Sequence, residues 1–163
     1  METLEELAPV LQTTSLIVGV GNVLRGDDAF GSLLAQRLKG KLSVKVVDAG
    51  SVPENYLGLI VKENPDTVLL IDAVDFGGQP AQMRLLNLRT CSTKSSFFTH
   101  SLTPDFLLSF LQQYTGAQVY LLAVQPVSLG LDVPLSPALS EELAILEGWF
   151  LAHYAPLTSR AEK

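Results

Sequence analysis

Two aspartates of this sequence each follow a short apolar run that predicts a buried strand. Asp28 follows residues 16–20 after a glycine-marked turn, and Asp72 directly follows residues 67–71. Carboxylates act as general acids or bases and bind cations, and two of them close together repel unless a proton or a cation lies between them. These two side chains are therefore the first candidates for a functional site.

Asp28 is the second member of an acidic pair at the start of a predicted helix. One acid there complements the free N–H groups and the dipole of the helix, and we expect Asp27 to fill this capping role. Asp28 is then available to point at something else. The turn before this helix is marked by three residues that we expect to support the site, Gly19, Gly21 and Asn22.

Predicted strands alternate with predicted helices along the whole chain, which is typical of a parallel sheet with helices on both faces. The five predicted strands cover residues 16–20, 43–47, 67–71, 83–88 and 118–124. A short link with Gly77, Gly78 and Pro80 resembles a hairpin, so we expect one antiparallel edge strand. We predict an α/β fold with a three-layer, doubly wound, five-stranded sheet in the order 2-1-3-5-4.

We expect residues 1–163 to form a single α/β domain. Residues 1–13 would be an N-terminal appendage at its edge, with a short amphipathic helix, and residues 156–163 a frayed tail. The core of the sheet should consist of seven fully buried residues, Ile17, Val18, Val46, Leu69, Leu70, Leu121 and Leu122.

The predicted topology brings Asp28 and Asp72 to one crevice, because ligands bind beyond the carboxyl ends of the strands where the strand order reverses. Asp48, after the second strand, lies one strand further out, and we expect a structural role for it. His100, in the polar segment before a predicted helix, is the third candidate. Two carboxylates and an imidazole suit a divalent transition metal with open coordination positions. His153 is expected to be a solvated bystander.

Three other site classes fit the residues less well. A dinucleotide site needs a third glycine where Leu24 stands, and the acidic pair would repel a pyrophosphate. A phosphoacceptor receiver domain needs a lysine after the fifth strand, where Gln125 and Pro126 stand instead. A thiol enzyme would use Cys91, but no predicted helix N-terminus activates that residue.

Composition excludes several classes of protein. The formal charge is −6, and the 11 basic residues are scattered, which argues against nucleic-acid binding. No apolar run is long enough to span a bilayer, and the acidic N-terminus differs from a targeting signal, so we expect no membrane association. The single cysteine excludes a disulfide framework and fits the reducing cytoplasm.

Five sequence blocks, in order, resemble the maturation endopeptidases of [NiFe] hydrogenases, and in particular the branch that processes the large subunit of hydrogenase 3. The blocks are GVGNVLRGDDAFG, VVDAGSVPEN, LLIDAVD, FTHSLTPD and LLAVQP. Together they span the chain from about Leu16 to Pro134. Two features depart from the pattern: Ala29 stands where many relatives have glycine, and the N-terminal extension is unusual for this branch.

The resemblance implies an aspartic-type or metal-dependent endopeptidase that removes a C-terminal peptide from the nickel-loaded precursor of the hydrogenase large subunit. By motif, its metal contacts fall on Asp28, Asp72 and His100, with Asp28 and Asp72 as the catalytic acids. Nickel would be supplied by the precursor, with no organic cofactor, and we expect a cytoplasmic monomer. Two alternatives stay open: a nickel-sensing chaperone without hydrolytic activity, and a protease with resident zinc.

Overall fold

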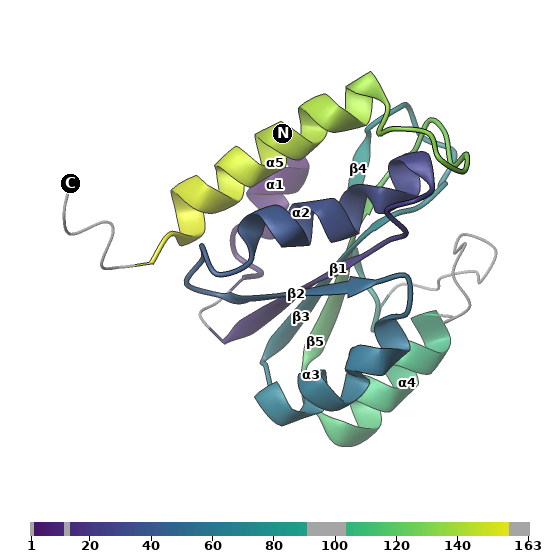
Figure 1. Cartoon of the computed structure of the whole chain (residues 1–163). Helices are drawn as coiled ribbons and strands as arrows, with labels where there is room; N and C mark the ends of the chain where they lie inside the picture. Colours follow the sequence, from purple (N-terminus) through teal and green to yellow (C-terminus); the bar gives the residue numbers. More distant parts are fainter. Residues whose placement is uncertain (1, 12–13, 91–103, 157–163) are drawn as a thin grey trace.

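The fold is a five-stranded sheet between two layers of helices (Figure 1). The computed structural model describes residues 2–11, 14–90 and 104–156. In chain order the elements are α1 (Glu2–Leu7), β1 (Ser15–Val20), the 3-10 helix η1 (Gly26–Ala29), α2 (Phe30–Leu38), β2 (Lys45–Gly50), the 3-10 helix η2 (Pro53–Tyr56), α3 (Leu57–Glu63), β3 (Thr67–Ala73), β4 (Met83–Asn87), α4 (Pro104–Tyr114), β5 (Gln118–Val124) and α5 (Pro137–Tyr154).

The strand order is β2-β1-β3-β5-β4, which confirms the prediction. β1, β2, β3 and β5 are parallel, and β4 is the antiparallel edge strand. The prediction of a hairpin between the third and fourth strands is wrong, because β4 pairs with β5 and not with β3. The link after β3 therefore crosses the end of β5 before the chain turns back.

Two strands extend further than their apolar runs. β3 continues through Asp72 to Ala73, and β2 begins at Lys45 and continues through Asp48 to Gly50. In each case pairing with a neighbouring strand holds a polar residue in extended conformation. Both aspartates are thus parts of strands rather than of the loops that follow.

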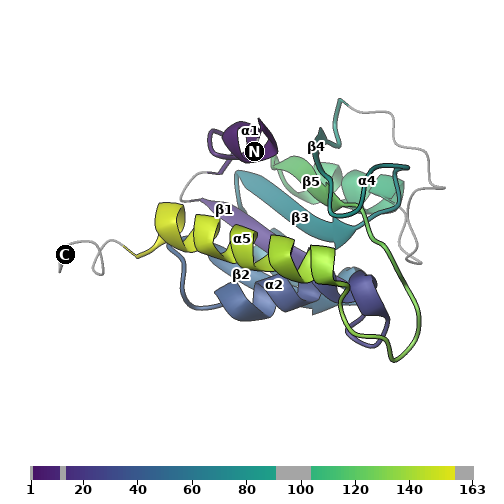
Figure 2. The same ribbon diagram turned by 90° about the horizontal axis from the view of Figure 1, so that it is seen from above.

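The two faces of the sheet carry separate apolar cores. One core joins β1, β3 and β5 to α1, α2 and α5 through residues such as Ile17, Leu69 and Phe150. The other joins the opposite face to α3 and α4 through residues such as Val18 and Leu121. All seven residues predicted for the core are buried. Figure 2 shows α5 and α2 side by side on their face of the sheet.

α2 packs closely against the sheet because the contact is formed by glycines, which have no side chain to hold the helix and the strands apart. A Cβ atom on Gly31 would fall closer than 3.0 Å to the carbonyl oxygens of Ile71 and Val20. A Cβ on Gly19 would clash in the same way with the Gly31 carbonyl oxygen. The helix that follows the acidic pair therefore rests directly on the ends of β1 and β3.

α1 contributes to the core beside the edge strand. Leu4 and Leu7 are buried in the same core as α2 and α5, and the Thr3 hydroxyl donates a hydrogen bond to the carbonyl oxygen of Met83 in β4 (3.3 Å). The hydroxyl of Tyr154, at the end of α5, donates to the carbonyl oxygen of Ala8 (3.2 Å). In the described part of the chain, no helix is both long and apolar enough to cross a bilayer.

Candidate active site

Asp72 lies at the point where the strand order reverses. It is buried near the carboxyl end of the central strand β3, directly after the last residue that pairs with β1. Side chains alternate along a strand, so Asp72 belongs to the face of Leu70 and Val68, which α3 and α4 cover. β1 has an irregular register between Gly19 and Val20, next to this position. The carboxylate therefore stands where a ligand crevice of an open α/β sheet is expected.

Asp28 lies beyond the carboxyl end of β1, in the turn that follows this strand. It is buried in η1, which contacts β3, and its Oδ2 accepts a hydrogen bond from the amide of Asn22 (3.3 Å). The Asn22 amide also donates to the Asp28 carbonyl oxygen (3.1 Å), so the turn closes on itself. A Cβ on Gly21 would fall on that same carbonyl oxygen, which explains the glycine.

Asp27 has a different role from the predicted helix cap. Neither η1 nor α2 has a side-chain cap, and the carboxylate of Asp27 is fully buried. Its Oδ2 accepts hydrogen bonds from the amides of Val127 (2.8 Å) and Ser128 (3.0 Å) and from the hydroxyl of Ser136 (2.9 Å), and its Oδ1 accepts from the amide of Ser136 (2.7 Å). Asp27 thus fastens the loop after β5 to the turn after β1.

Asp48 is bound to the helix beside it. Its Oδ1 accepts hydrogen bonds from the Ser32 hydroxyl (2.6 Å) and from the amide of Gly50 (3.0 Å), and its Oδ2 accepts from the side chain of Gln36 (3.0 Å). These contacts join β2 to α2 on the other side of β1 from β3. The arrangement fits the structural role that its position favoured.

Gln125 organises the loop that leaves β3. It is buried, and its Oε1 accepts hydrogen bonds from the amides of Phe76 (2.9 Å) and Gly78 (3.0 Å). Its Nε2 donates to Oδ1 of Asp75 (2.9 Å), and this bond, together with one from the Gly77 amide, lowers the pKa of that carboxyl. The segment that follows Asp72 is therefore fixed by one amide side chain from the end of β5.

Comparison with known proteins places these features in a family. Residues 30–151, well over half of the chain, match the family model HycI, described as hydrogenase maturation protease. The hydrogenase 3 maturation protease of Escherichia coli K12 is 30% identical over 142 residues, covering 83% of this chain and 90% of that protein. The chain belongs to the hydrogenase maturation protease family.

Solved structures agree with this family membership. The crystal structure of the [NiFe] hydrogenase maturation protease HycI from Thermococcus kodakarensis KOD1 superposes with a TM-score of 0.81 at 33% identity, covering 91% of this chain and 97% of that one. The solution structure of the endopeptidase HycI from Escherichia coli superposes with a TM-score of 0.74 at 27% identity, covering 85% of this chain and 89% of that one. Both neighbours therefore share the fold of this chain over most of its length.

Two residues that the sequence singled out in this maturation protease lie outside the described residues, His100 and Cys91. α4, which begins at Pro104, ends three residues before β5 begins. Its C-terminus therefore lies at the amino ends of the strands and its N-terminus at their carboxyl ends, as Figure 1 shows.

His153 is exposed at the end of α5, where its ring stacks on Trp149 (4.6 Å between centroids).

The described residues of the maturation protease contain no group of three His, Cys, Asp or Glu side chains that could hold a metal ion. That finding covers Asp28 and Asp72 but not the predicted third ligand, which lies in the segment 91–103. A complete set would thus need a side chain from outside the described part, or ligands from the substrate.

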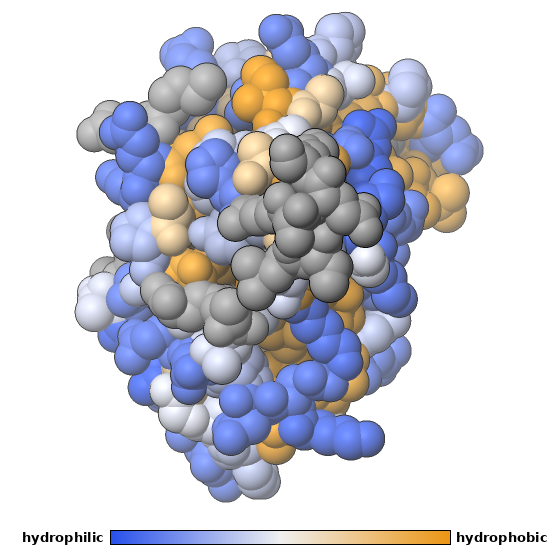
Figure 3. All heavy atoms as spheres, turned by 90° about the vertical axis from the view of Figure 1, so that its left-hand side faces the viewer, coloured by the Kyte–Doolittle hydropathy of each residue, from blue (hydrophilic) through white to orange (hydrophobic). Residues whose placement is uncertain are grey.

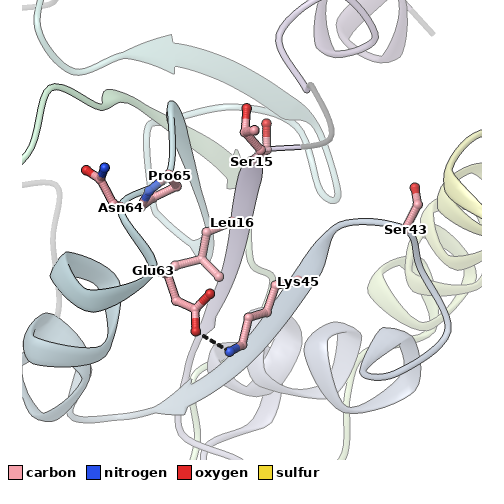
Figure 4. A pocket seen from close by; sticks show the side chains of 8 residues that line it. Ser15, Leu16, Ser43, Lys45, Glu63, Asn64 and Pro65 are labelled. Carbon is pink, nitrogen blue, oxygen red and sulfur yellow. Dashed lines mark hydrogen bonds and ion pairs between the residues drawn. The ribbon is translucent and has the colours of Figure 1, made fainter.

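A pocket of about 250 Å³ opens at the opposite edge of the maturation protease, between the amino ends of the strands (Figure 4). Lys45 and Glu63 form an ion pair across it, beside Asn64. Figure 3 looks onto this side of the molecule, where hydrophilic residues predominate with smaller apolar areas between them. The pocket's main charges neutralise each other, and neither candidate carboxylate lines it. It is therefore a poor candidate for the protease site.

The sequence reasoning missed three positions in the site. Ser136 and Gln125 hold the loops on either side of it, and Gly31 lets α2 approach the strands. Of these three, only Gln125 could have been found from the sequence. A polar residue directly after a buried strand needs hydrogen-bond partners, which indicates a structural role. The bonds of Ser136 join residues 109 positions apart, and such a separation leaves no local pattern.

Proposed function

We propose that this protein removes a C-terminal peptide from the precursor of a [NiFe] hydrogenase large subunit that already holds its nickel. Asp28, Asp72 and His100 are the residues that we assign to contact with that ion. The observation that carries this assignment is the burial of two carboxylates at the switch point between β1 and β3. Ligands of open α/β sheets bind at this switch point, and carboxylates are common ligands of divalent cations.

The position of α4 supports the inclusion of His100. That residue precedes the helix by only four positions in the sequence. α4 also covers the face of the sheet to which Asp72 belongs. An imidazole and two carboxylates without a thiolate bind nickel or zinc moderately and leave coordination positions for other ligands.

The ion of the precursor would act as a Lewis acid toward the scissile carbonyl. In this proposal Asp28 and Asp72 orient the bound precursor, and one of them accepts the proton of the attacking water. The reaction takes place in the cytoplasm and needs no organic cofactor. A monomer suffices, because the proposed groups all come from one chain.

The deciding experiment is an assay of peptide release from the nickel-loaded precursor. Asp72→Asn keeps the size of the side chain but removes its charge, so the variant should fold and release no peptide. His100→Ala should behave in the same way. Two matched variants should release the peptide at the normal rate. They are Asp66→Asn, at an exposed aspartate on the amino-terminal edge of the sheet, and His153→Ala. Normal processing by Asp72→Asn would remove Asp72 from the mechanism.

The two alternatives give different results with the unmodified protein. A nickel-sensing chaperone would bind the loaded precursor without ever producing the shorter subunit. A protease with resident zinc would contain one zinc per chain, lose activity on chelation and regain it with zinc. Our proposal expects little metal in the isolated protein, no cleavage of nickel-free precursor, and activity that survives brief chelation of the protein alone.

A further inference from the structure

Apolar side chains are concentrated on the surface next to Asp28. Among the described residues, eight large apolar side chains are exposed, and five of them lie in the loops that follow β1 and β5. We call these five residues the apolar rim: Val23 (51% exposed), Leu24 (59%), Val127 (56%), Leu131 (65%) and Val133 (43%). Isolated exposed apolar residues are normal, but a cluster of this kind indicates a binding surface.

The two loops of the apolar rim form one connected surface. The amide of Asp132 donates a hydrogen bond to the carbonyl oxygen of Leu24 (2.8 Å), and the amide of Asp27 donates to that of Ser128 (2.8 Å). Figures 1 and 2 both show the green loop before α5 lying against the dark blue start of α2. Because the loops are already fixed to each other, a ligand would not have to order them.

We propose that the apolar rim binds the C-terminal segment of the hydrogenase precursor, in extended conformation and through apolar side chains next to the scissile bond. This inference rests on the proposed function and adds the surface that selects the substrate. Leu24 of the rim precedes Asp28 by four residues in the same turn, where the amide of Asp28 donates a hydrogen bond to the carbonyl oxygen of Arg25 (3.1 Å). An endopeptidase must hold the chain beside the bond that it cuts, so the peptide has to pass this surface.

The chemistry of the apolar rim favours this occupant over others. Its two charged neighbours, Arg25 and Asp132, are both exposed and have opposite signs, so the rim has no net charge with which to attract a charged ligand. A stable dimer buries about 800 Å² on each partner, and five side chains offer much less. A short apolar peptide matches both the size and the lack of charge.

The test compares the double variant Leu24→Ser/Leu131→Ser with the unmodified protein. Ile145→Ser is the matched control, since Ile145 is also an exposed apolar residue (38%) but lies on α5. Initial rates of peptide release are measured against the concentration of nickel-loaded precursor. The double variant should raise KM about tenfold or more and leave kcat within about twofold, because the lost contacts hold the substrate without touching the reacting atoms. The control should leave both constants unchanged.

Direct binding identifies the segment that the rim contacts. The dissociation constant of the full precursor should rise in the double variant by the same factor as KM. A precursor that lacks its C-terminal extension should bind both proteins equally. Circular dichroism and thermal unfolding establish that the double variant is folded, and if it is not, the two single variants replace it.

The possible failures are distinguishable. If the unmodified protein binds the precursor but never cuts it, the proposed function fails, while the binding comparison still tests the rim. If the unmodified protein cuts and the variants keep their KM and affinity, the rim is not a substrate surface. If the unmodified protein self-associates in sedimentation experiments and only the double variant does not, with KM unchanged, the rim joins two copies of this chain and our inference is wrong.

Discussion

Asp27 and Asp28 are adjacent in sequence, yet their carboxylates have different surroundings. The oxygens of Asp27 accept four hydrogen bonds from the loop after β5, whereas Oδ2 of Asp28 accepts one from the turn after β1. A carboxylate that accepts several bonds from distant amides is a structural anchor. Asp27 is therefore committed to the scaffold of the site, and Asp28 stays the member of the pair that we propose for contact with the substrate.

The anchoring role of Asp27 can be measured as stability. Asp27→Asn replaces one acceptor oxygen by an amide that can only donate, so buried N–H groups of the loop lose their acceptor. We expect the free energy of unfolding to fall by about 3 kcal/mol, measured by denaturant titration. Glu141→Gln, which neutralises an exposed acid on α5, should change it by less than about 0.5 kcal/mol. Equal losses of stability in the two variants would contradict the anchoring role of Asp27.

Residue type and position in the chain were enough to predict where Asp28 and Asp72 lie in the fold, but not what Asp27 contacts. An aspartate at the end of a buried strand reaches the carboxyl edge of the sheet in any fold of this class. The four groups that donate to Asp27 belong to Val127, Ser128 and Ser136, about 100 positions away. Only the folded chain brings them together, so capping was the sole role that local sequence could suggest.

At the scale of elements, the approach of α2 to the sheet depends on one missing side chain. Gly31→Ala would place a Cβ against the carbonyl oxygens of two strands, and neither strand can move without breaking its pairing. We expect a loss of about 1–3 kcal/mol in the free energy of unfolding. Gly58→Ala, in α3, is the matched control, because nothing lies within 4 Å of its Cβ position and alanine is the better helix former. It should stabilise the protein by up to about 1 kcal/mol.

The loop after β3 depends on Gln125 in a way that pH can reveal. Its hydrogen bond stabilises the ionised form of Asp75 and lowers the pKa of that carboxyl. The bond therefore supports the loop above the ordinary pKa of aspartate, and this support is lost as the pH falls through the lowered pKa.

Replacing the glutamine by leucine should move the Asp75 titration toward its ordinary value. In Gln125→Leu we expect the pKa of Asp75 to rise, followed by side-chain NMR, and the amides of Phe76 and Gly78 to exchange faster with solvent. Gln118→Leu, at the exposed start of β5, should change neither quantity. An unchanged Asp75 titration in Gln125→Leu would show that the amide does not hold this loop.

For the whole molecule, the order of the strands was predictable because apolar runs alternate with helical spacings along the chain. Few sheet topologies are compatible with such an alternation. The form of the link between β3 and β4 was not predictable. This link is short enough for a hairpin, but the segment instead crosses the end of β5, where backbone bonds from Gln125 and Val124 hold it. Turn residues indicate where a chain bends and do not indicate which strand it then joins.

The position of α1 has a consequence for the colloidal behaviour of the protein. Within the described residues β4 pairs with β5 alone, and α1 lies beside it through Leu4, Leu7 and the Thr3 hydrogen bond to Met83. A sheet edge with open backbone groups is a template onto which a strand of another molecule can add. The first residues of this chain therefore act as a guard against fibril-like association, and their removal should make the protein prone to aggregate even where the remaining fold stays intact.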